Sequence, residues 1–490
     1  MSSTTPALCR AGNLRHVKTS QYYLSSEVEI VRVSSSNPHG ATIFFSRINE
    51  LPLTRGLMTL TAGVLEDSDI TSPKFKANPF PLFAQLRAER PVCRATLPDR
   101  TPIWLVTRYD DVNLVLKDER FAKNRHVAMT PEQLRKLPWV PPMFRPLERN
   151  MLDLGPPDHT RLRSLVQKAF SPRLVEHMRE RIQSLADELL ICHAGTGEIE
   201  LIRDFALPLP LTIITEILGV PVRDRQKFHK WSKVIVSANP HTLRLVSTLP
   251  GKRFHKWSKL IVTANRFKVP LGFFSAVWKF NRYLHSLFNV KRADPGDDLT
   301  TALLQAEEAG EQLSEDELLG MIFLLLIAGH ETTVNLISGG TLALLQNPDQ
   351  MQKLRVDPSL INTAIEELLR YTAPVFMTTE RFAREDVIIR GVTIRRGEIV
   401  FGVIGSANRD EAIFETPGEL DISRENNRHL AFGNGTHFCL GAPLARLEGQ
   451  IAINTLLQRA PDLRMNVPSE SLRWRRSLIL RGLESLPLAL

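Results

Sequence analysis

Residues 432–441 of the chain read FGNGTHFCLG, and residues 442–446 continue as APLAR. The glycines of this stretch let the backbone fold tightly against something flat and bulky, because glycine tolerates conformations that are closed to other residues. Pro443 suits the first turn of a helix, so the stretch predicts a helix that begins just after Cys439. Backbone N–H groups and the helix dipole at such an N-terminus favour the thiolate, the form of cysteine that binds metals or attacks electrophiles.

The spacing of these residues resembles the haem-binding loop of the cytochrome P450 monooxygenases, F-G-x-G-x-H-x-C-x-G. The resemblance extends from about residue 75 to the C-terminus. It implies the cytochrome P450 fold, which is mainly α with small β-sheets, and haem b (iron protoporphyrin IX) as the cofactor. It also implies that Cys439 is the axial ligand of the iron, where a thiolate favours O–O cleavage. From the residues alone, the alternative is a buried core cysteine in a glycine-rich loop.

A long helix is predicted to begin after Ser314, because Ser314 and Glu317 have the spacing of a capping box. Its middle, residues 328–333, reads AGHETT, and an acid with two hydroxyl groups inside a buried helix is costly unless these groups are paired or functional. The glycine permits close approach of a ligand or a local opening of the helix. The resemblance implies that Glu331 and Thr332 are the proton-delivery pair. The alternative is a structural kink in which the hydroxyl bonds the carbonyl four residues earlier.

Four side chains are candidates for binding the two haem propionates, namely His159, Arg163, Arg381 and His437. The first two are four residues apart and therefore share one face of a predicted helix. The resemblance implies this role for all four, through the family's H-x-x-x-R helix, its R-x-A-x-E-D strand and the histidine two residues before the cysteine. Guanidinium and imidazole groups bind carboxylates well. The alternative for each is an ordinary surface cation.

Glu367 and Arg370 are three residues apart on a further predicted helix and can pair on one of its faces. The resemblance implies that this E-x-x-R motif forms a buried structural ion pair behind the haem. We therefore expect both residues to support the fold rather than to take part in catalysis.

The composition is that of a soluble globular protein, with 490 residues of which 43% are hydrophobic and 23% charged, and it excludes a disordered or collagen-like chain. The net charge is +9, but the basic residues are scattered, so no nucleic-acid partner is expected. Four cysteines without a CxxC motif make a zinc site or a disulfide framework unlikely and fit a cytoplasmic location. The most apolar stretch, residues 318–328, is far shorter than the ~20 residues of a membrane span, so no membrane anchor is expected.

Two domains of unequal character are predicted: a loosely ordered N-terminal extension over residues 1–66 and a haem-thiolate catalytic domain over residues 67–490. One repeat stands out, because residues 227–239 recur as residues 253–265 with ten of thirteen positions identical. By its order along the chain, the repeat falls in the lid over the substrate pocket of the family. We expect the first copy to pack there and the second to be displaced.

The predicted activity is that of a monooxygenase that activates O2 and inserts one oxygen atom into a small apolar organic substrate, by hydroxylation or epoxidation. No flavin or iron–sulfur motif is visible, so electrons are expected from a separate ferredoxin and its NAD(P)H-dependent ferredoxin reductase. Two alternatives stay open. One is a peroxide-driven peroxygenase, and the other is a non-catalytic haem-binding protein whose lid is blocked by the duplicated segment.

Overall fold

The computed structural model describes residues 69–98, 100–135, 149–170, 172–193, 195–225, 271–308 and 313–490, together with Pro146, Lys227 and Trp231. All of these residues belong to the unit Val64–Leu490. The predicted extension over residues 1–66 lies outside the described residues. So does almost all of the repeat at 227–239 and 253–265, and the prediction that one copy packs over the pocket therefore stays a prediction.

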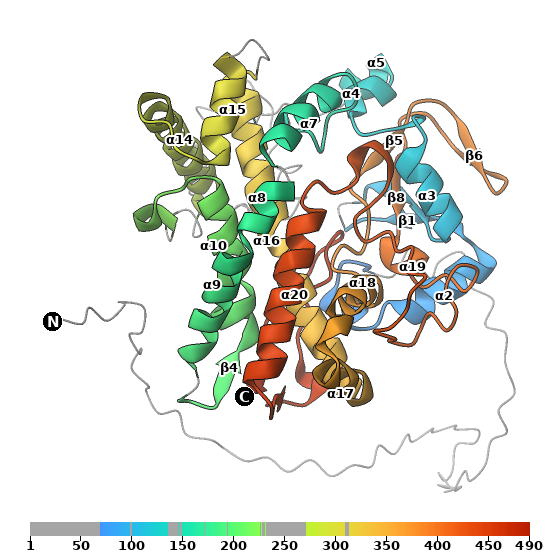
Figure 1. Ribbon diagram of the computed structural model, residues 1–490. Helices are drawn as coiled ribbons and strands as arrows, with labels where there is room; N and C mark the ends of the chain where they lie inside the picture. Colours follow the sequence, from blue (N-terminus) through green and yellow to red (C-terminus); the bar gives the residue numbers. More distant parts are fainter. Residues whose placement is uncertain are drawn as a thin grey trace, which may run out of the picture. The chain divides into compact units, whose positions relative to one another are not determined.

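Helices make up most of the described structure (Figure 1), as the resemblance implied. They are α1 (Pro73–Ala77), α2 (Phe80–Glu89), α3 (Tyr109–Lys117), α4 (Arg125–Ala128), α5 (Pro131–Arg135), α7 (Asp158–Ala169), α8 (Pro172–His177), α9 (Arg179–Ile191), α10 (Pro208–Ile217), α14 (Leu271–Ala293), α15 (Leu299–Glu308), α16 (Glu315–Gln346), α17 (Pro348–Val356), α18 (Ile361–Thr372), α19 (Ile404–Ala407) and α20 (Ala442–Arg459). A π-helical turn, η2, covers Ile202–Ala206, and short 3-10 turns are η4 (Pro358–Leu360), η5 (Gly435–His437) and η6 (Ser469–Ser471).

The strands form small sheets from segments that are far apart in the sequence. The largest has the order β1-β2-β8-β5-β3, and Figure 1 shows its early strands in blue beside its late strands in orange. In this sheet β2 runs parallel to β8, with Trp104 opposite Val400. The strands are β1 (Val92–Thr96), β2 (Pro102–Val106), β3 (Phe121–Ala122), β4 (Glu198–Glu200), β5 (Arg381–Ala383), β6 (Val387–Ile389), β7 (Val392–Ile394), β8 (Ile399–Gly402), β9 (Arg464–Met465) and β10 (Pro487–Ala489).

Helix α16 is the central helix of the core. Its capping box forms as predicted, with the Ser314 hydroxyl accepting from the Glu317 N–H and the Glu317 carboxylate accepting from the Ser314 N–H. The helix packs against α10, α18 and α20. Of the two roles that Gly329 permits, a local opening of the helix is not seen, because α16 is continuous from Glu315 to Gln346. A Cβ at Gly329 would lie 3.0 Å from Cγ1 of Ile214, so this glycine allows α10 to approach the helix closely.

The apolar part of α16 extends well beyond residues 318–328. Among the helices that the structure describes, α16 is the one long and apolar enough to cross a membrane by length and composition. Most of its hydrophobic side chains are buried in the protein core, which is the ordinary reason for such a composition in a central helix.

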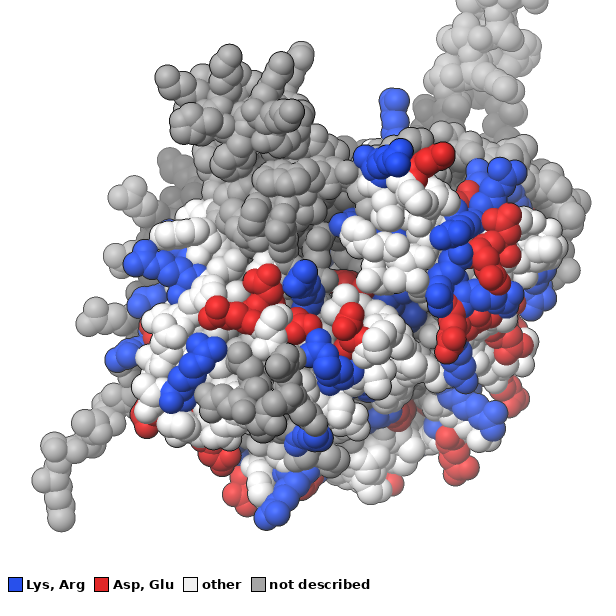
Figure 2. All heavy atoms as spheres, turned by 90° about the horizontal axis from the view of Figure 1, so that it is seen from above, with Lys and Arg blue, Asp and Glu red and all other residues white. Residues whose placement is uncertain are grey.

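Acidic and basic side chains are intermingled on the described surface seen from above α7 and α15 (Figure 2). The basic residues of this face do not gather into one continuous stripe. The distribution on the described part of this face agrees with the scattered charge noted in the sequence.

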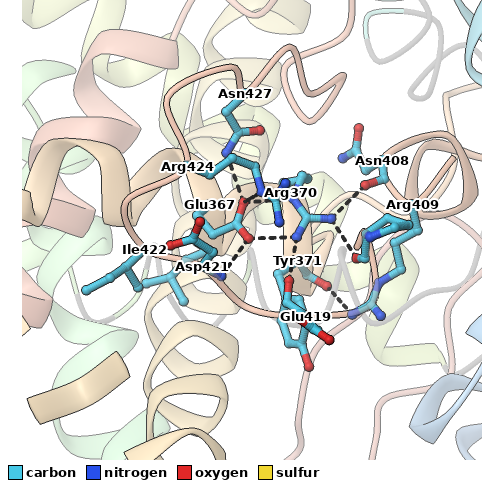
Figure 3. A network of polar contacts seen from close by, with 12 residues as sticks. Glu367, Arg370, Tyr371, Asn408, Arg409, Glu419, Asp421, Ile422, Arg424 and Asn427 are labelled. Atoms are coloured by element: carbon cyan, nitrogen blue, oxygen red, sulfur yellow. Dashed lines mark hydrogen bonds and ion pairs between the residues drawn. The ribbon is translucent and has the colours of Figure 1, made fainter. Parts of the chain in front are cut away.

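The Glu367–Arg370 pair on α18 is fully buried, with both side chains 0% exposed (Figure 3). Two parallel hydrogen bonds of 2.7 Å join the Arg370 guanidinium to the Glu367 carboxylate. Bidentate pairs of this kind are strong and geometrically specific. The carboxylate also accepts from the Arg424 guanidinium at 3.2 Å and from the Asn427 amide at 3.0 Å.

The rest of the Arg370 guanidinium holds an irregular segment in place (Figure 3). It donates to the backbone carbonyls of Asn408, Pro417 and Glu419 at 3.0, 2.8 and 2.9 Å. Residues 408–427 are therefore tied to α18 at several points along their length. This segment leads directly into the cysteine loop at residues 432–441.

Substituting Glu367→Ala should prevent accumulation of folded protein. The change leaves the buried Arg370 charge uncompensated, and breaking such a pair costs about 3 to 5 kcal/mol, a large part of a typical stability of ~5 to 15 kcal/mol. The measurement is the yield of soluble protein and its haem content. The matched control is Glu176→Ala, which breaks the exposed pair of the same spacing between Glu176 and Arg179. Equal yields for the two variants would show that the buried pair is dispensable.

Candidate functional site

The cysteine loop turns sharply before it enters α20. Gly433 and Gly435 have φ of +70° and +72°, a region that favours glycine. The Cys439 N–H donates to the Phe432 carbonyl at 2.9 Å and closes the loop. A Cβ at Gly435 would lie 3.1 Å from the carbonyl oxygen of Leu116, so the loop also packs closely on α3. Helix α20 begins at residue 442 with proline in its first turn, as predicted.

The Cys439 thiol experiences opposing influences. Burial raises its pKa, whereas the backbone N–H groups of Gly441 and Ala442 and the charges of Arg163 and Arg446 lower it. The expected preference for the thiolate at the start of α20 is present, but burial outweighs it and the pKa lies above its ordinary value. A metal ion at the sulfur reverses this balance, because a coordinating thiol loses its proton.

Cys439 is at the same time exposed to molecules of the size of water. The thiol is therefore closely surrounded by protein and yet accessible. Ala328, in the middle of the core helix α16, is likewise exposed. The loop and the central helix thus both offer accessible atoms.

The four predicted propionate-binding residues come together from three elements. His159 and Arg163 lie on α7, Arg381 on β5 and His437 on η5. The rings of His159 and His437 have centroids 4.2 Å apart. Burial and the charges of Arg381, His159 and Arg163 together lower the pKa of His437 to about 2. The side chains that the sequence places almost 300 residues apart therefore form one cluster.

This cluster carries positive charge without a counter-ion from the described residues. Arg381 is 5% exposed, its Nε has no hydrogen-bond partner, and burial lowers its pKa to about 10. Arg163 makes no ion pair with a carboxylate of the described part of the chain, and burial lowers its pKa as well. Buried unpaired charge is costly. Two carboxylates would compensate the cluster, so the residues present fit a haem with its propionates here and its iron at Cys439.

Lys123 joins the cluster and was not predicted. It is 6% exposed, and its ammonium group donates to the Thr379 hydroxyl at 2.7 Å and to the Glu380 carbonyl at 3.0 Å. Burial lowers its pKa to about 8, and its charge is among those that lower the pKa of His437. No sequence signal separates it from the many exposed lysines, because the contacts come from a distant segment.

Glu331 and Thr332 on α16 are adjacent in the sequence but have different partners. The Thr332 hydroxyl donates to the Ala328 carbonyl at 3.0 Å, which is the bond of the structural alternative, and its oxygen can still accept. The Glu331 carboxylate accepts from Arg475 Nη1 at 2.8 Å. His330 Nε2 lies 3.7 Å from the other Glu331 oxygen. Arg475, which the sequence did not identify, thus compensates the acid inside this helix.

Glu448 on α20 is a second buried acid that sequence reasoning missed. It is 0% exposed, and neither carboxyl oxygen makes a well-formed hydrogen bond among the described residues. Burial raises its pKa to about 8, although the nearby Thr333 hydroxyl on α16 lowers it. Glu448 is therefore largely protonated at neutral pH. The signal available in the sequence was an acid on a helix face that is otherwise apolar.

Substituting Glu448→Gln should weaken the pH dependence of stability. The folded wild type keeps its proton up to about pH 8, whereas an unfolded glutamate loses it near pH 4.5, so folding becomes less favourable as the pH rises between these values. Between about pH 5 and 7.5 the variant should gain of the order of 3 kcal/mol relative to the wild type. Urea denaturation of the holoprotein across this range measures the difference. The exposed Glu188 on α9 provides the control Glu188→Gln, and parallel profiles for Glu448→Gln and wild type would contradict the assignment.

Comparisons with known proteins agree with this geometry. The family model described as Cytochrome P450 matches residues 74–460. The polyketide biosynthesis cytochrome P450 PksS of Bacillus subtilis (strain 168) is 42% identical over 420 residues, which are 85% of this chain and 97% of the relative. Cytochrome P450 107B1 of Saccharopolyspora erythraea is 44% identical over 430 residues, 87% of this chain and 99% of the relative.

Solved structures extend the likeness to three dimensions. The structure of PksS has a TM-score of 0.75 at 41% identity and covers 86% of this chain and 99% of that one. P450BioI, solved in complex with an acyl carrier protein that bears hexadec-9Z-enoic acid, has a TM-score of 0.71 at 38% identity. This match covers 85% of this chain and 99% of that chain.

Proposed function

Because the chain belongs to the cytochrome P450 family and is a monooxygenase with haem b as its cofactor, we propose that it inserts one atom of O2 into an apolar organic substrate. The reaction is a hydroxylation or an epoxidation. The observation that carries the proposal is the accessible Cys439 thiol beside a buried, uncompensated cluster of positive side chains. When bound, haem b supplies the activation of dioxygen, which no amino-acid side chain provides.

In this proposal Cys439 is the protein ligand of the iron. His159, Arg163, Arg381 and His437 bind the propionates and fix the orientation of the ring. The burial of Arg381 and its unpartnered Nε support its assignment, because a carboxylate would satisfy both the charge and the N–H group.

We assign proton delivery to Glu331 and Thr332. The Thr332 hydroxyl donates to the Ala328 carbonyl, so its oxygen is oriented to accept a hydrogen bond from water or from a protonated group of the reacting oxygen substrate. Glu331 is held by Arg475, whose side chain is 34% exposed and therefore meets solvent. A proton that enters from solvent near Arg475 reaches Glu331 first and the Thr332 region next.

The electrons are proposed to come from a ferredoxin and an NAD(P)H-dependent ferredoxin reductase in the cytoplasm. The names of the relatives support an apolar substrate, since PksS acts in polyketide biosynthesis and P450BioI was solved with a fatty acyl chain on its carrier protein. Neither the peroxygenase nor the non-catalytic alternative receives support from the relatives, which are cytochrome P450 enzymes.

Replacing Cys439→His should abolish thiolate ligation. The reduced, carbon monoxide-bound wild type should show the red-shifted Soret band of a thiolate-ligated haem, and the variant should lose it, because imidazole does not donate charge as a thiolate does. The carbon monoxide difference spectrum is the measurement. Cys192→Ser, at an exposed cysteine, is the control and should keep the band. Persistence of the band in Cys439→His would refute the assignment of the ligand.

Replacing Thr332→Ala should uncouple the reaction while haem and substrate still bind. Without the hydroxyl, proton delivery is misdirected and reducing equivalents are lost as hydrogen peroxide, so the ratio of product to NAD(P)H consumed should fall severalfold. The control is Thr341→Ala, which removes the same type of hydroxyl-to-carbonyl bond, 2.8 Å to Ile337, from the same helix. Equal ratios in both variants would favour the purely structural reading of Thr332.

A further inference from the structure

An ion pair joins α18 and α20 next to the cysteine loop. The Arg446 guanidinium donates two parallel hydrogen bonds of 2.7 Å to the Glu366 carboxylate. His429 Nε2 lies 3.2 Å from the same carboxylate. The hydrogen bonds from Arg446 and His429 lower the pKa of Glu366 to about 2 against its burial, so the carboxylate is ionised at neutral pH. The pair is therefore a fixed arrangement of one positive and one negative charge.

The positive end of this pair faces the cysteine loop. The Arg446 guanidinium lies over the Phe432 ring, 4.5 Å from its centroid, and the Phe432 carbonyl accepts the hydrogen bond from the Cys439 N–H. Arg446 and Cys439 also interact electrostatically.

Arg446 differs from the other guanidinium that acts on Cys439. Arg163 belongs to the buried cationic cluster, where the propionates would neutralise it. Arg446 already has its carboxylate partner in Glu366, so its orientation does not depend on the cofactor.

We propose that the Glu366–Arg446 pair is a positioning device that sets the reduction potential of the haem iron through the Cys439 thiolate. The inference rests on the proposed role of Cys439 as the iron ligand. One electron from the redox partner converts ferric to ferrous iron and adds a negative charge next to the sulfur. A positive charge at Arg446 favours this step, and the Glu366 carboxylate opposes it while it holds the guanidinium in place.

The test compares two substitutions that break the same ion pair but change the charge in opposite directions. In the holoprotein, Arg446→Gln should shift the ferric–ferrous equilibrium toward ferric, and Glu366→Gln should shift it toward ferrous. Because both side chains are about one-third exposed, solvent weakens the effect, and a shift of about three- to tenfold is expected. Tenfold corresponds to about 59 mV for one electron. The potential of the double variant should lie between those of the two single variants.

Spectroelectrochemical titration of the haem measures these potentials. Arg459→Gln is the matched control, since it removes one positive charge from the far end of the same helix α20, where Arg459 pairs with Asp187. Arg446→Lys keeps the positive charge but not the planar bidentate contact. Its reduction potential should therefore be closer to that of the wild type than the potential of Arg446→Gln is. If Arg446→Gln loses haem, the reduction potentials of Glu366→Gln and Arg446→Lys still test the proposal. The first should be higher than that of the wild type, and the second should be close to it.

Shifts of Arg446→Gln and Glu366→Gln in the same direction would overturn the proposal, because loosening of the loop would then explain both. Potentials no different from that of Arg459→Gln would overturn it equally. Failure of the proposed function is distinguishable from these outcomes. If the wild type itself lacked the red-shifted carbon monoxide band, Cys439 would not be the ligand and the inference would fall with it.

Discussion

The buried bidentate contact between Arg370 and Glu367 is the interaction on which the cysteine loop depends. A guanidinium in the core is costly unless it is hydrogen-bonded, and Arg370 is bonded to one carboxylate and three backbone carbonyls. Those carbonyls belong to residues 408–419, a segment with little regular structure of its own. The hydrogen bonds that the buried Arg370 needs therefore fix the backbone of this segment. The segment in turn places the loop at 432–441 at the start of α20.

The pattern of paired and unpaired charged side chains also indicates where the haem site lies. Glu331 is paired with Arg475 and Glu366 with Arg446, whereas Arg163 and Arg381 lack a carboxylate partner among the described residues. Lys76 and Arg481 also lack a carboxylate partner, but they donate to backbone carbonyls, whereas Nε of the buried Arg381 has no acceptor among the described residues. The uncompensated cluster lies within electrostatic reach of Cys439 through Arg163. One sulfur ligand and several cations together match a group that carries both a metal and carboxylates.

Local signals were sufficient for much of the fold and part of the site. The capping box at Ser314 and the proline after Cys439 specify helix starts through contacts within a few residues, and both helices begin as predicted. Lys123 and Arg475 could not be predicted, since their surroundings are built by segments far away in the sequence, and Glu448 gave only the weak signal of an acid on an otherwise apolar helix face. The same limit explains the Cys439 thiol, where the helix N-terminus favours the thiolate but burial, a tertiary property, dominates.

Two consecutive glutamates of α18 show how one helix serves both the fold and the site. Successive residues of an α-helix are separated by about 100° around its axis, because a turn holds 3.6 residues. Glu367 therefore points into the core toward Arg370, while Glu366 reaches α20 and holds Arg446 beside the cysteine loop. Any rotation of α18 would move both carboxylates together. The burial of Glu367, which fixes the rotation of the helix, consequently also fixes the place of the charge pair next to Cys439.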